Sequence, residues 1–483
     1  MIETYSIVAR NNSDNTIADL KDFYSLIDGS LVRDGLKLKV VNPATLDTVG
    51  VAIVPSLRDL QQAIYAADRA FRAWRDEPWK VRSSLLRGLA DVLRSNTEEL
   101  ARLLTQEQGK PLQQARDETI SCAGFLEHCS GQELRPVVLN ENPETYAEQF
   151  YLPYGVVAGI VPWNFPLDVA ISKIGPAIIT GNSIIIKPAP TTPLATLRFG
   201  ELIKDVVPPG LIQIIADDGS IGPALVSHPS IAKISFTGST ASGKAVMASA
   251  ARGLKRLSLE LGGNDPAIVF EDVDVTRVAQ AIFNAAFLNS GQVCTAIKRV
   301  YVHAAIADRF CECLASLARN SVVGDGLDVN VTVGPLQNKA QYDKVLQYLD
   351  EAEKVGRIVA GGNAPPLAGY FINPTIVTDI SDEASLVKDE QFGPILPVLT
   401  FTDVDEVVRR ANGTPFGLTA SVWSADKDRA ARIARRLDSG VVWVNKHLEF
   451  SLDYPFSPCK QSGFGTEGGI EGLKEYAQLR VLS

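Results

Sequence analysis

The sequence predicts an α/β protein with two lobes that meet near residue 262. From Gly155 onward, short apolar runs of strand length alternate with helical patterns, and the alternation resumes after Cys294. Strands that alternate with helices build parallel β-α-β units, so we expect one sheet on each side of residue 262. The chain has 483 residues, and 46% of them are hydrophobic, which is enough for a large core and more than one domain.

The N-terminal part is expected to contain strands followed by two long helices. Residues 25–54 alternate apolar and polar around Asn42 to Thr45, the pattern of strands joined by a turn. Ser56 to Asp59 is a capping-box pattern that begins a helix, and a second helix is expected from about Val81 to Gln108. The first helix should bury a stripe of residues at spacings of four and three: Leu60, Ile64, Ala67, Phe71 and Trp74.

After these helices, residues 134–152 are extended and rich in β-prone residues, as expected of an inserted hairpin. The alternating region then supplies the predicted strands of the two sheets. They are residues 156–161, 183–187, 212–215, 231–236, 267–270, 299–302, 357–360, 395–400 and 420–423.

Composition and charge exclude several classes of function. The net charge is −9 and neither half carries a basic block, which argues against nucleic acid or an anionic membrane as a partner. The six cysteines form no C-x-x-C pair and the four histidines no H-E-x-x-H motif, so we expect no metal site. Residues 1–24 lack a signal-peptide pattern, and no apolar run approaches the ~18 residues of a membrane span. We expect a cytoplasmic protein with free thiols.

A cysteine and a glutamate next to glycines give the strongest chemical signal. Cys294 lies in Gly-Gln-Val-Cys-Thr-Ala at 291–296, and Glu260 ends an apolar run before Gly262 and Gly263. Small neighbours leave room for a carbonyl compound to approach a thiol, and a carboxylate can activate water. A lone cysteine is more often a core residue and a glutamate a surface residue, so these neighbours decide the interpretation. The other cysteines are expected in helices or, for the last, in a loop: Cys122, Cys129, Cys311, Cys313 and Cys459.

Four further motifs indicate a ligand. Asn164 lies between prolines at 162 and 166, which fits either a rigid turn or an amide fixed to donate to an oxyanion. Residues 236–245 resemble a phosphate-binding loop after a strand, but Ala245 replaces the hydroxyl that would hold Mg²⁺. Lys187 ends an apolar run and Glu390 precedes a Gly-Pro turn, so both are candidate cofactor contacts.

In this order, the motifs resemble those of the aldehyde dehydrogenase superfamily, of the NAD(P)-dependent, non-acylating type. The resemblance covers nearly the whole chain, and the matches are colinear. They are Pro162–Pro166, Lys187–Pro188, Phe236–Ser239, Glu260–Gly263, Gly291–Cys294, Glu390–Pro394, Phe416–Leu418 and Lys460–Gly465.

The resemblance implies a Rossmann-like cofactor-binding lobe, an α/β catalytic lobe and a small β oligomerisation element. The implied cofactor-binding domain comprises residues 1–133 and 153–261, and the catalytic domain comprises residues 262–446. A homodimer or a homotetramer is implied. The remaining segments are the oligomerisation element, residues 134–152 and 471–483, and a returning loop region, residues 447–470.

The resemblance also assigns roles to residues. Cys294 would attack an aldehyde substrate to give a thiohemiacetal and then a thioester, with the oxyanion held by the Asn164 amide and the Cys294 backbone N–H. Glu260 would activate water to hydrolyse the thioester, and Lys173 would lie in a proton path below it. The implied cofactor contacts are Trp163, Lys187, Pro190, Gly238, Ser239, Leu261, Glu390 and Phe392. The implied substrate channel is lined by Phe165, Asp168, Val169, Ser172, Leu288, Val293, Thr295 and Phe450.

Three departures from the family pattern qualify these roles. Pro190 stands where NAD-using members often carry a glutamate, so NADP is less strongly excluded. NAD is favoured, because no arginine or extra lysine lies nearby to receive a 2′-phosphate. Residues 455–458 read Pro-Phe-Ser-Pro instead of Pro-Phe-Gly-Gly, which predicts a loop of different shape. Asp168 and Ser172 replace residues that are often apolar or aromatic, which predicts a wider or more polar channel.

Three other functions stay open. A CoA-acylating semialdehyde dehydrogenase would not need the hydrolytic base Glu260. A P-loop nucleotide hydrolase would need the hydroxyl that Ala245 lacks. A non-catalytic member of the superfamily would not need the cysteine, the glutamate and the asparagine together.

Overall fold

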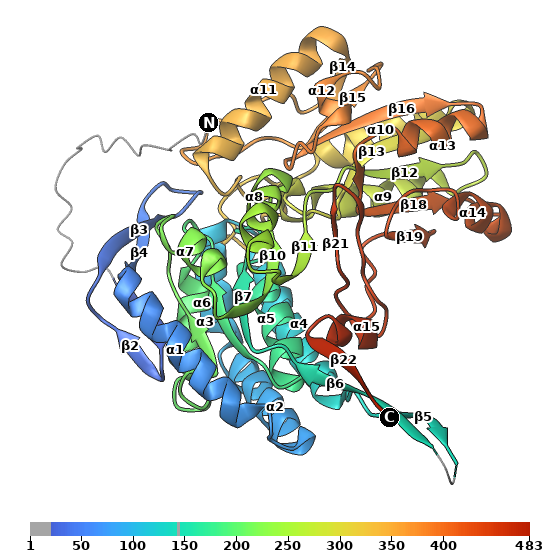
Figure 1. Ribbon diagram of the computed structural model, residues 1–483. Coiled ribbons are helices and arrows are strands. Elements are labelled where there is room, and N and C mark those ends of the chain that lie inside the picture. The colour runs from blue at the N-terminus through green and yellow to red at the C-terminus, as the bar shows by residue number, and fades with distance from the viewer. Residues whose placement is uncertain (1–20, 143–144) are drawn as a thin grey trace.

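The computed structural model describes residues 21–142 and 145–483. Two large sheets with helices packed on them lie one above the other in Figure 1, and a small sheet projects from the lower one as an arm. The predicted α/β fold with two main sheets is confirmed. The expected lack of a signal peptide concerns mainly residues 1–20, which lie outside the described residues, as do residues 143–144 of the predicted hairpin.

Ten strands of the described chain form the first sheet, in the order β21-β11-β10-β7-β8-β9-β1-β4-β3, with β2 paired to β1. The segment from β7 to β11 is parallel: β7, β8 and β9 progress across the sheet, and the chain then crosses to β10 and β11 on the other side of β7. Such a switch point leaves a crevice at the carboxyl ends of the strands, where ligands bind. The strands are β1 (Asp22–Ile27), β2 (Ser30–Val32), β3 (Leu36–Val41), β4 (Thr48–Val54), β7 (Val156–Ile160), β8 (Ser183–Lys187), β9 (Ile212–Ile214), β10 (Ile231–Thr237), β11 (Arg256–Glu260) and β21 (Gly463–Phe464).

The first predicted helix forms as expected, but the second is divided in two. Ser56 and Asp59 make a reciprocal capping box. Leu60, Ile64, Ala67 and Trp74 of the predicted stripe are buried, whereas Phe71 is only half-buried. The helix expected over 81–108 is broken at Asn96, whose Nδ2 donates to the Val92 carbonyl at 2.7 Å. Asparagine competes in this way with the backbone hydrogen bonds of the helix. The helix therefore breaks at Asn96, although the apolar spacing of the sequence continues across it. The helices are α1 (Leu57–Trp74), α2 (Trp79–Ser95), α3 (Thr97–Gln108), α4 (Leu112–Gly131), α5 (Pro166–Ile179), α6 (Leu194–Ile203), α7 (Ile221–Ser227) and α8 (Thr240–Ala251).

Seven strands of the described chain form the second sheet, in the order β14-β15-β16-β13-β12-β18-β19. It is parallel except for the edge strand β14. The sequence analysis did not predict β15 and β19, which have four residues each. The strands are β12 (Asp265–Val269), β13 (Ile297–His303), β14 (Arg357–Ala360), β15 (Thr375–Thr378), β16 (Ile395–Phe401), β18 (Thr419–Trp423) and β19 (Val441–Val444). The helices are α9 (Val275–Phe287), η2 (Leu288–Gly291), η3 (Ala304–Ile306), α10 (Ala307–Arg319), α11 (Lys339–Val355), α12 (Ser385–Lys388), α13 (Val404–Asn412) and α14 (Lys427–Ala434).

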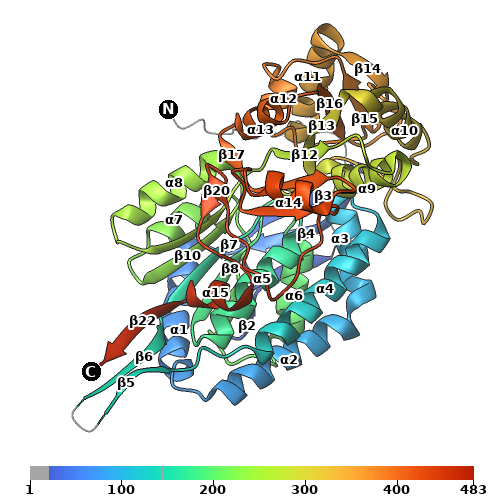
Figure 2. The ribbon, with the colours of Figure 1, turned by 90° about the vertical axis from the view of Figure 1, so that its right-hand side faces the viewer.

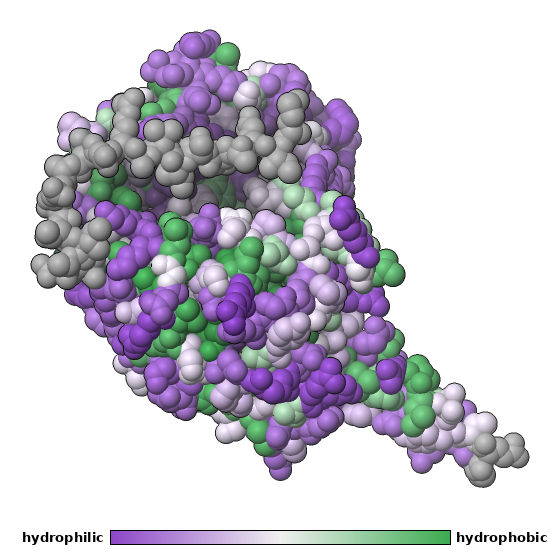
Figure 3. All heavy atoms as spheres, turned by 60° about the vertical axis from the view of Figure 1, so that its left-hand side comes forward, coloured by the Kyte–Doolittle hydropathy of each residue, from purple (hydrophilic) through white to green (hydrophobic). Residues whose placement is uncertain are grey.

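The arm joins the predicted hairpin to the C-terminal strand. Antiparallel β5 (Val137–Glu141) and β6 (Tyr146–Pro153) form the hairpin, and β22 (Ala477–Leu482) pairs along the other side of β6. Figure 3 shows the arm standing clear of the body, with hydrophobic side chains exposed on it. The exposed hydrophobic residues of these strands are Val137, Val138, Leu139, Tyr146, Leu479, Val481 and Leu482.

The C-terminal segment returns from the second sheet to the first. Figures 1 and 2 show this segment as extended chain that runs down to α15 (Gly469–Lys474), and in Figure 1 it passes beside β11. On the way, β21 pairs with the end of β11 beside Glu260. Cys459, expected in a loop, lies in the two-residue strand β20 (Cys459–Lys460), which pairs with β17 (Phe416–Gly417). Among the described residues, no helix has the length and apolar character needed to cross a membrane.

Candidate active site

Two glycines bring the segment around Glu260 against the predicted nucleophile. A Cβ on Gly263 would collide with the carbonyl oxygen of Cys294, and a Cβ on Gly262 would collide with the Glu390 carboxylate. Glu390 Oε1 accepts the Gly263 N–H at 3.0 Å. Only glycine allows this approach, so three segments that are distant in the sequence meet where the two sheets adjoin.

A strained turn leads into Cys294. Asn289, Ser290 and Gly291 all have positive φ, of 48°, 57° and 75°. This conformation costs a non-glycine residue ~1–2 kcal/mol and persists where the surroundings fix it. Asn289 Nδ2 donates to the Asn164 carbonyl oxygen at 3.0 Å, and Ser290 Oγ donates to a neighbouring loop carbonyl at 2.8 Å. The turn therefore ties the cysteine segment to the Asn164 segment.

Asn164 is buried beside that turn and held from two sides. Its Nδ2 donates to the Gln292 carbonyl at 3.0 Å, two residues before Cys294. Its own carbonyl also accepts from Lys110 Nζ at 2.9 Å. Lys110 forms an ion pair with Glu118, and the two side chains are 0% and 1% exposed. Glu118 Oε1 also accepts backbone N–H groups from the first turn of α5, each at 3.2 Å. This ion pair ties the Pro-Trp-Asn loop, which connects β7 to α5, to α4.

Glu260 lies buried at the end of β11, next to an ion pair that the sequence motifs revealed only in part. Burial raises the pKa of the Glu260 carboxyl well above its usual range, nearby Glu467 acts in the same direction, and Lys173 opposes both. Lys173 Nζ donates to Glu467 Oε1 at 3.0 Å and to Thr237 Oγ1 at 2.8 Å. Glu467 was missed, although it precedes Gly468 and Gly469 much as Glu260 precedes its glycine pair.

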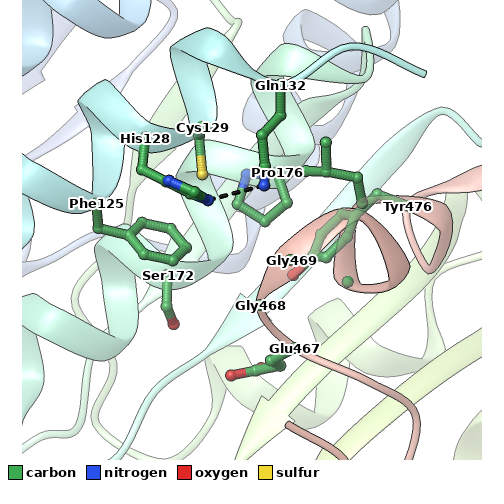
Figure 4. A pocket seen from close by; sticks show the side chains of 12 residues that line it. Phe125, His128, Cys129, Gln132, Ser172, Pro176, Glu467, Gly468, Gly469 and Tyr476 are labelled. Atoms are coloured by element: carbon green, nitrogen blue, oxygen red, sulfur yellow. Dashed lines mark hydrogen bonds between the residues drawn. The ribbon is translucent and has the colours of Figure 1, made fainter. Parts of the chain in front are cut away.

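Glu467 connects this group to a pocket between α4, α5 and the C-terminal segment. Figure 4 shows Ser172 and Glu467 on its wall, with His128 and Tyr476 from the flanking elements. The chain Glu260, Lys173 and Glu467 thus runs from the junction of the sheets toward a surface hollow.

The Cys294 thiol is half-buried and surrounded by acidic groups. Burial raises its pKa to about 12; Glu390, Glu260 and Asp265 act in the same direction, and Lys298 opposes them. Lys298 Nζ donates to the backbone carbonyls of residues 291 and 293, at 2.8 and 2.7 Å. The thiol is therefore protonated at neutral pH in this state of the protein.

The predicted cofactor contacts lie along the carboxyl edge of the first sheet and across to the second. The rings of Trp163 and Phe392 meet edge to face, 5.3 Å between centroids. Lys187 ends β8, where its Nζ lies 3.2 Å from Asp217 Oδ2. Pro190 follows in the next turn and brings no charge.

The phosphate-loop-like segment is a strand–turn–helix, as its sequence predicted. Gly238 and Ser239 form the turn between β10 and α8, and the Ser239 hydroxyl caps the helix. Leu261 packs against Gly243 of α8, and a Cβ on Gly243 would collide with the Leu261 side chain. The first backbone N–H groups of a helix lack partners within the helix and attract anions. Lys244 Nζ, however, donates to Gln461 Oε1 at 2.9 Å, so the lysine is engaged elsewhere.

The predicted channel residues come from three segments of the chain. Phe165, Asp168, Val169 and Ser172 lie on α5 or directly before it, and Leu288, Val293 and Thr295 lie around Cys294. Burial and the neighbouring Glu118 raise the pKa of Asp168 to about 7. Phe450 is 54% exposed and packs against Trp443 of β19 and Phe456 of the returning segment. Within the described residues, no group of His, Cys, Asp or Glu side chains is placed to hold a metal ion.

The chain matches known proteins over nearly its whole length. The model of the aldehyde dehydrogenase family matches residues 32–482. The chain is 38% identical over 469 residues to the aldehyde dehydrogenase LUC3 of a Fusarium species, covering 96% of this chain and 99% of that protein. It is 37% identical over 467 residues to the succinate-semialdehyde dehydrogenase [NADP(+)] GabD of Escherichia coli K12, covering 95% and 97%.

A solved structure shares the fold over nearly the same length. The NAD⁺ complex of an aldehyde dehydrogenase from Bacillus cereus superimposes with a TM-score of 0.93 at 34% identity, covering 96% of each chain. These relationships define an enzyme class built on this two-sheet fold. The chain belongs to the aldehyde dehydrogenase family, so the family predicted from the motifs is confirmed.

Proposed function

We propose that this enzyme oxidises an aldehyde to the carboxylic acid with NAD or NADP, through covalent intermediates on Cys294. The observation that carries the proposal is the meeting of the cysteine turn with the Asn164 loop, Gly263 and Glu390. The relatives include a dehydrogenase named for NADP and a structure with NAD⁺ bound, which supports a nicotinamide cofactor.

The residues at the sheet edge fit such a cofactor. The turn at Gly238 and Ser239 would hold the pyrophosphate through the α8 backbone, and Lys187 lies where a ribose would reach the end of β8. Trp163, Leu261 and Phe392 would supply apolar contacts, and Glu390 a hydrogen-bond acceptor for the second ribose. Bound NAD(P) supplies the acceptor for the hydride that leaves the substrate carbon.

The side chains around Cys294 would then carry out the remaining chemistry. The thiol gives its proton to solvent water as sulfur bonds to the aldehyde carbon. The oxyanion that forms would accept hydrogen bonds from the Asn164 amide and the Cys294 backbone N–H. An amide group has two donors, and only one is used by the Gln292 carbonyl. Donors that are fixed before the reaction stabilise such an anion without reorganisation.

Glu260 would serve as the base that removes a proton from water during thioester hydrolysis. A raised pKa brings a carboxyl closer to the operating pH, where a base is most effective. The proton would leave through Lys173 and Glu467 toward the pocket of Figure 4. A buried hydrolytic base and its outlet favour release of the acid over transfer to CoA.

We also propose that the two large sheets belong to domains with different roles, and that the protein forms an oligomer. The part built on the first sheet, residues 1–133 and 153–261, would bind the cofactor, and residues 262–446 would carry the nucleophile. The arm, from residues 134–152 and 471–483, has exposed apolar residues and an exposed edge on β22, which favour pairing with a second copy. Light scattering should give a homodimer or a homotetramer, and a monomer at micromolar concentration would contradict this.

The reaction is tested by cofactor reduction with a panel of aliphatic, aromatic and charged aldehydes. Wild-type protein and the matched control Cys459→Ala should reduce NAD or NADP and release acid without CoA. Cys294→Ala should bind the cofactor but not turn over. Turnover that requires CoA would favour the acylating alternative, and activity retained in Cys294→Ala would remove the cysteine from the mechanism.

A further inference from the structure

A buried ion pair at the carboxyl edge of the first sheet was not foreseen from the sequence. Lys187 is the last residue of β8, and Asp217 lies three residues beyond β9, the neighbouring strand. Their charged atoms are 3.2 Å apart, and the side chains are 10% and 4% exposed. Buried charges are retained in a fold where they are paired or serve a site.

The two oxygens of the Asp217 carboxylate have different partners. Oδ1 accepts the N–H groups of Gly219 and Ile221, at 2.8 and 2.9 Å, and so holds the loop that enters α7. Oδ2 faces Lys187. Gly222 leaves space for the pair, because a Cβ there would lie 3.3 Å from Asp217 Oδ2 and 3.5 Å from Lys187 Cδ. Asp217 therefore has one oxygen that is not needed by its own loop.

The position of the pair matters for dinucleotide choice. In doubly wound sheets the ligand lies outside the carboxyl ends of the strands, and an acidic side chain there binds the ribose 2′-hydroxyl of NAD, whereas a cation accommodates the 2′-phosphate of NADP. Lys187 alone would be such a cation. Pro190, the other residue expected at this ribose, is uncharged and so cannot offset the positive charge of Lys187.

We propose that Asp217 sets the preference of this enzyme for NAD over NADP. It neutralises Lys187, offers a carboxylate oxygen beside the ribose, and repels a 2′-phosphate. The inference rests on the proposed use of a nicotinamide dinucleotide. At an effective dielectric constant of about 20, a unit charge about 5 Å from a phosphate would change its binding by roughly a hundredfold or more.

The test is a fluorescence titration of NADH and NADPH into wild type, Asp217→Asn and Asp218→Asn. Asparagine keeps an Oδ1 acceptor for the two loop N–H groups and removes only the charge. Asp218 is exposed and bonds to Ser220, so its variant is the matched loss of one charge in the same loop. Thermal unfolding of all three proteins checks that the fold is intact.

The inference predicts tighter binding of NADH than of NADPH by wild type and by Asp218→Asn. In Asp217→Asn the ratio of the two dissociation constants should move toward NADPH by about tenfold or more. An unchanged ratio, including an equal loss of both affinities, would overturn the role of Asp217, as would a wild-type preference for NADPH. If wild type binds neither dinucleotide, the proposed function itself fails, and the inference with it.

Discussion

The Glu260→Gln variant should separate the two halves of the reaction. Glutamine keeps the size and one hydrogen-bonding oxygen of the buried side chain, but it cannot take a proton. Formation of the thioester should continue, because the nucleophile, the oxyanion donors and the cofactor contacts are unchanged. Hydrolysis should slow, since a positioned general base contributes roughly a factor of 100–10,000.

The structure gives a reason to expect the upper part of that range. Glu260 lies at the buried end of β11, with the Lys173–Glu467 pair beyond it and acidic groups around Cys294. No other carboxylate in the described site combines burial at the sheet junction with a direct outlet of this kind. A substitute base would therefore have to be a water molecule alone, at a cost of several orders of magnitude in rate.

Rapid mixing of enzyme, cofactor and aldehyde measures both phases. The variant should give a burst of about one reduced cofactor per active site, followed by a slow steady state. Wild type should show a smaller burst or none, and the conservative variant Glu260→Asp should recover part of the steady-state rate. A variant without a burst, or one that turns over at the wild-type rate, would refute the assignment of Glu260 as the hydrolytic base.

Three further outcomes follow from the same geometry. Asn164→Ala should lower kcat by roughly 100–1,000-fold with a small effect on cofactor affinity, measured by steady-state kinetics and titration, and a change confined to KM would contradict the oxyanion role. Alkylation of Cys294 by iodoacetamide in the free enzyme should accelerate about tenfold per pH unit from pH 7 to 10, because burial raises the thiol pKa to about 12 and the thiolate fraction still rises there. A rate that levels off above about pH 9 in peptide mass spectra would show a normal thiol, with a pKa of about 8.5. Lys110→Met should lower the free energy of unfolding by about 3–5 kcal/mol, because it leaves Glu118 buried without its partner. The exposed control Lys339→Met should change it by less than about 1 kcal/mol in chemical denaturation, and equal effects would contradict the value of the buried pair.

Much of the fold followed from periodicity, because fully buried parallel strands appear in the sequence as short apolar runs. Strands β7, β8 and β10 were predicted within two residues of their observed ends. The break at Asn96 was not predicted, since the apolar spacing continues across it. Hydrogen bonds between a side chain and the local backbone decide such a boundary, and they leave little trace in a hydrophobic pattern.

The site was predicted where its chemistry is local in sequence. The cysteine between small residues and the glutamate before two glycines are visible in short strings, and the structure brings those strings together. Lys110, Asp217 and Glu467 were missed, because each acts through a partner 8 to 294 residues away in the sequence. Only the fold reveals that these charges are paired, and that Lys110 and Asp217 are buried.

The most direct test of covalent catalysis is to quench wild-type enzyme and Glu260→Gln during turnover and to map the adduct by peptide mass spectrometry. The proposed mechanism predicts an acyl group on Cys294 that accumulates in the variant, requires the oxidised cofactor, and is absent from Cys294→Ala. An acid product formed with no adduct on Cys294, or an adduct on another cysteine, would contradict the mechanism.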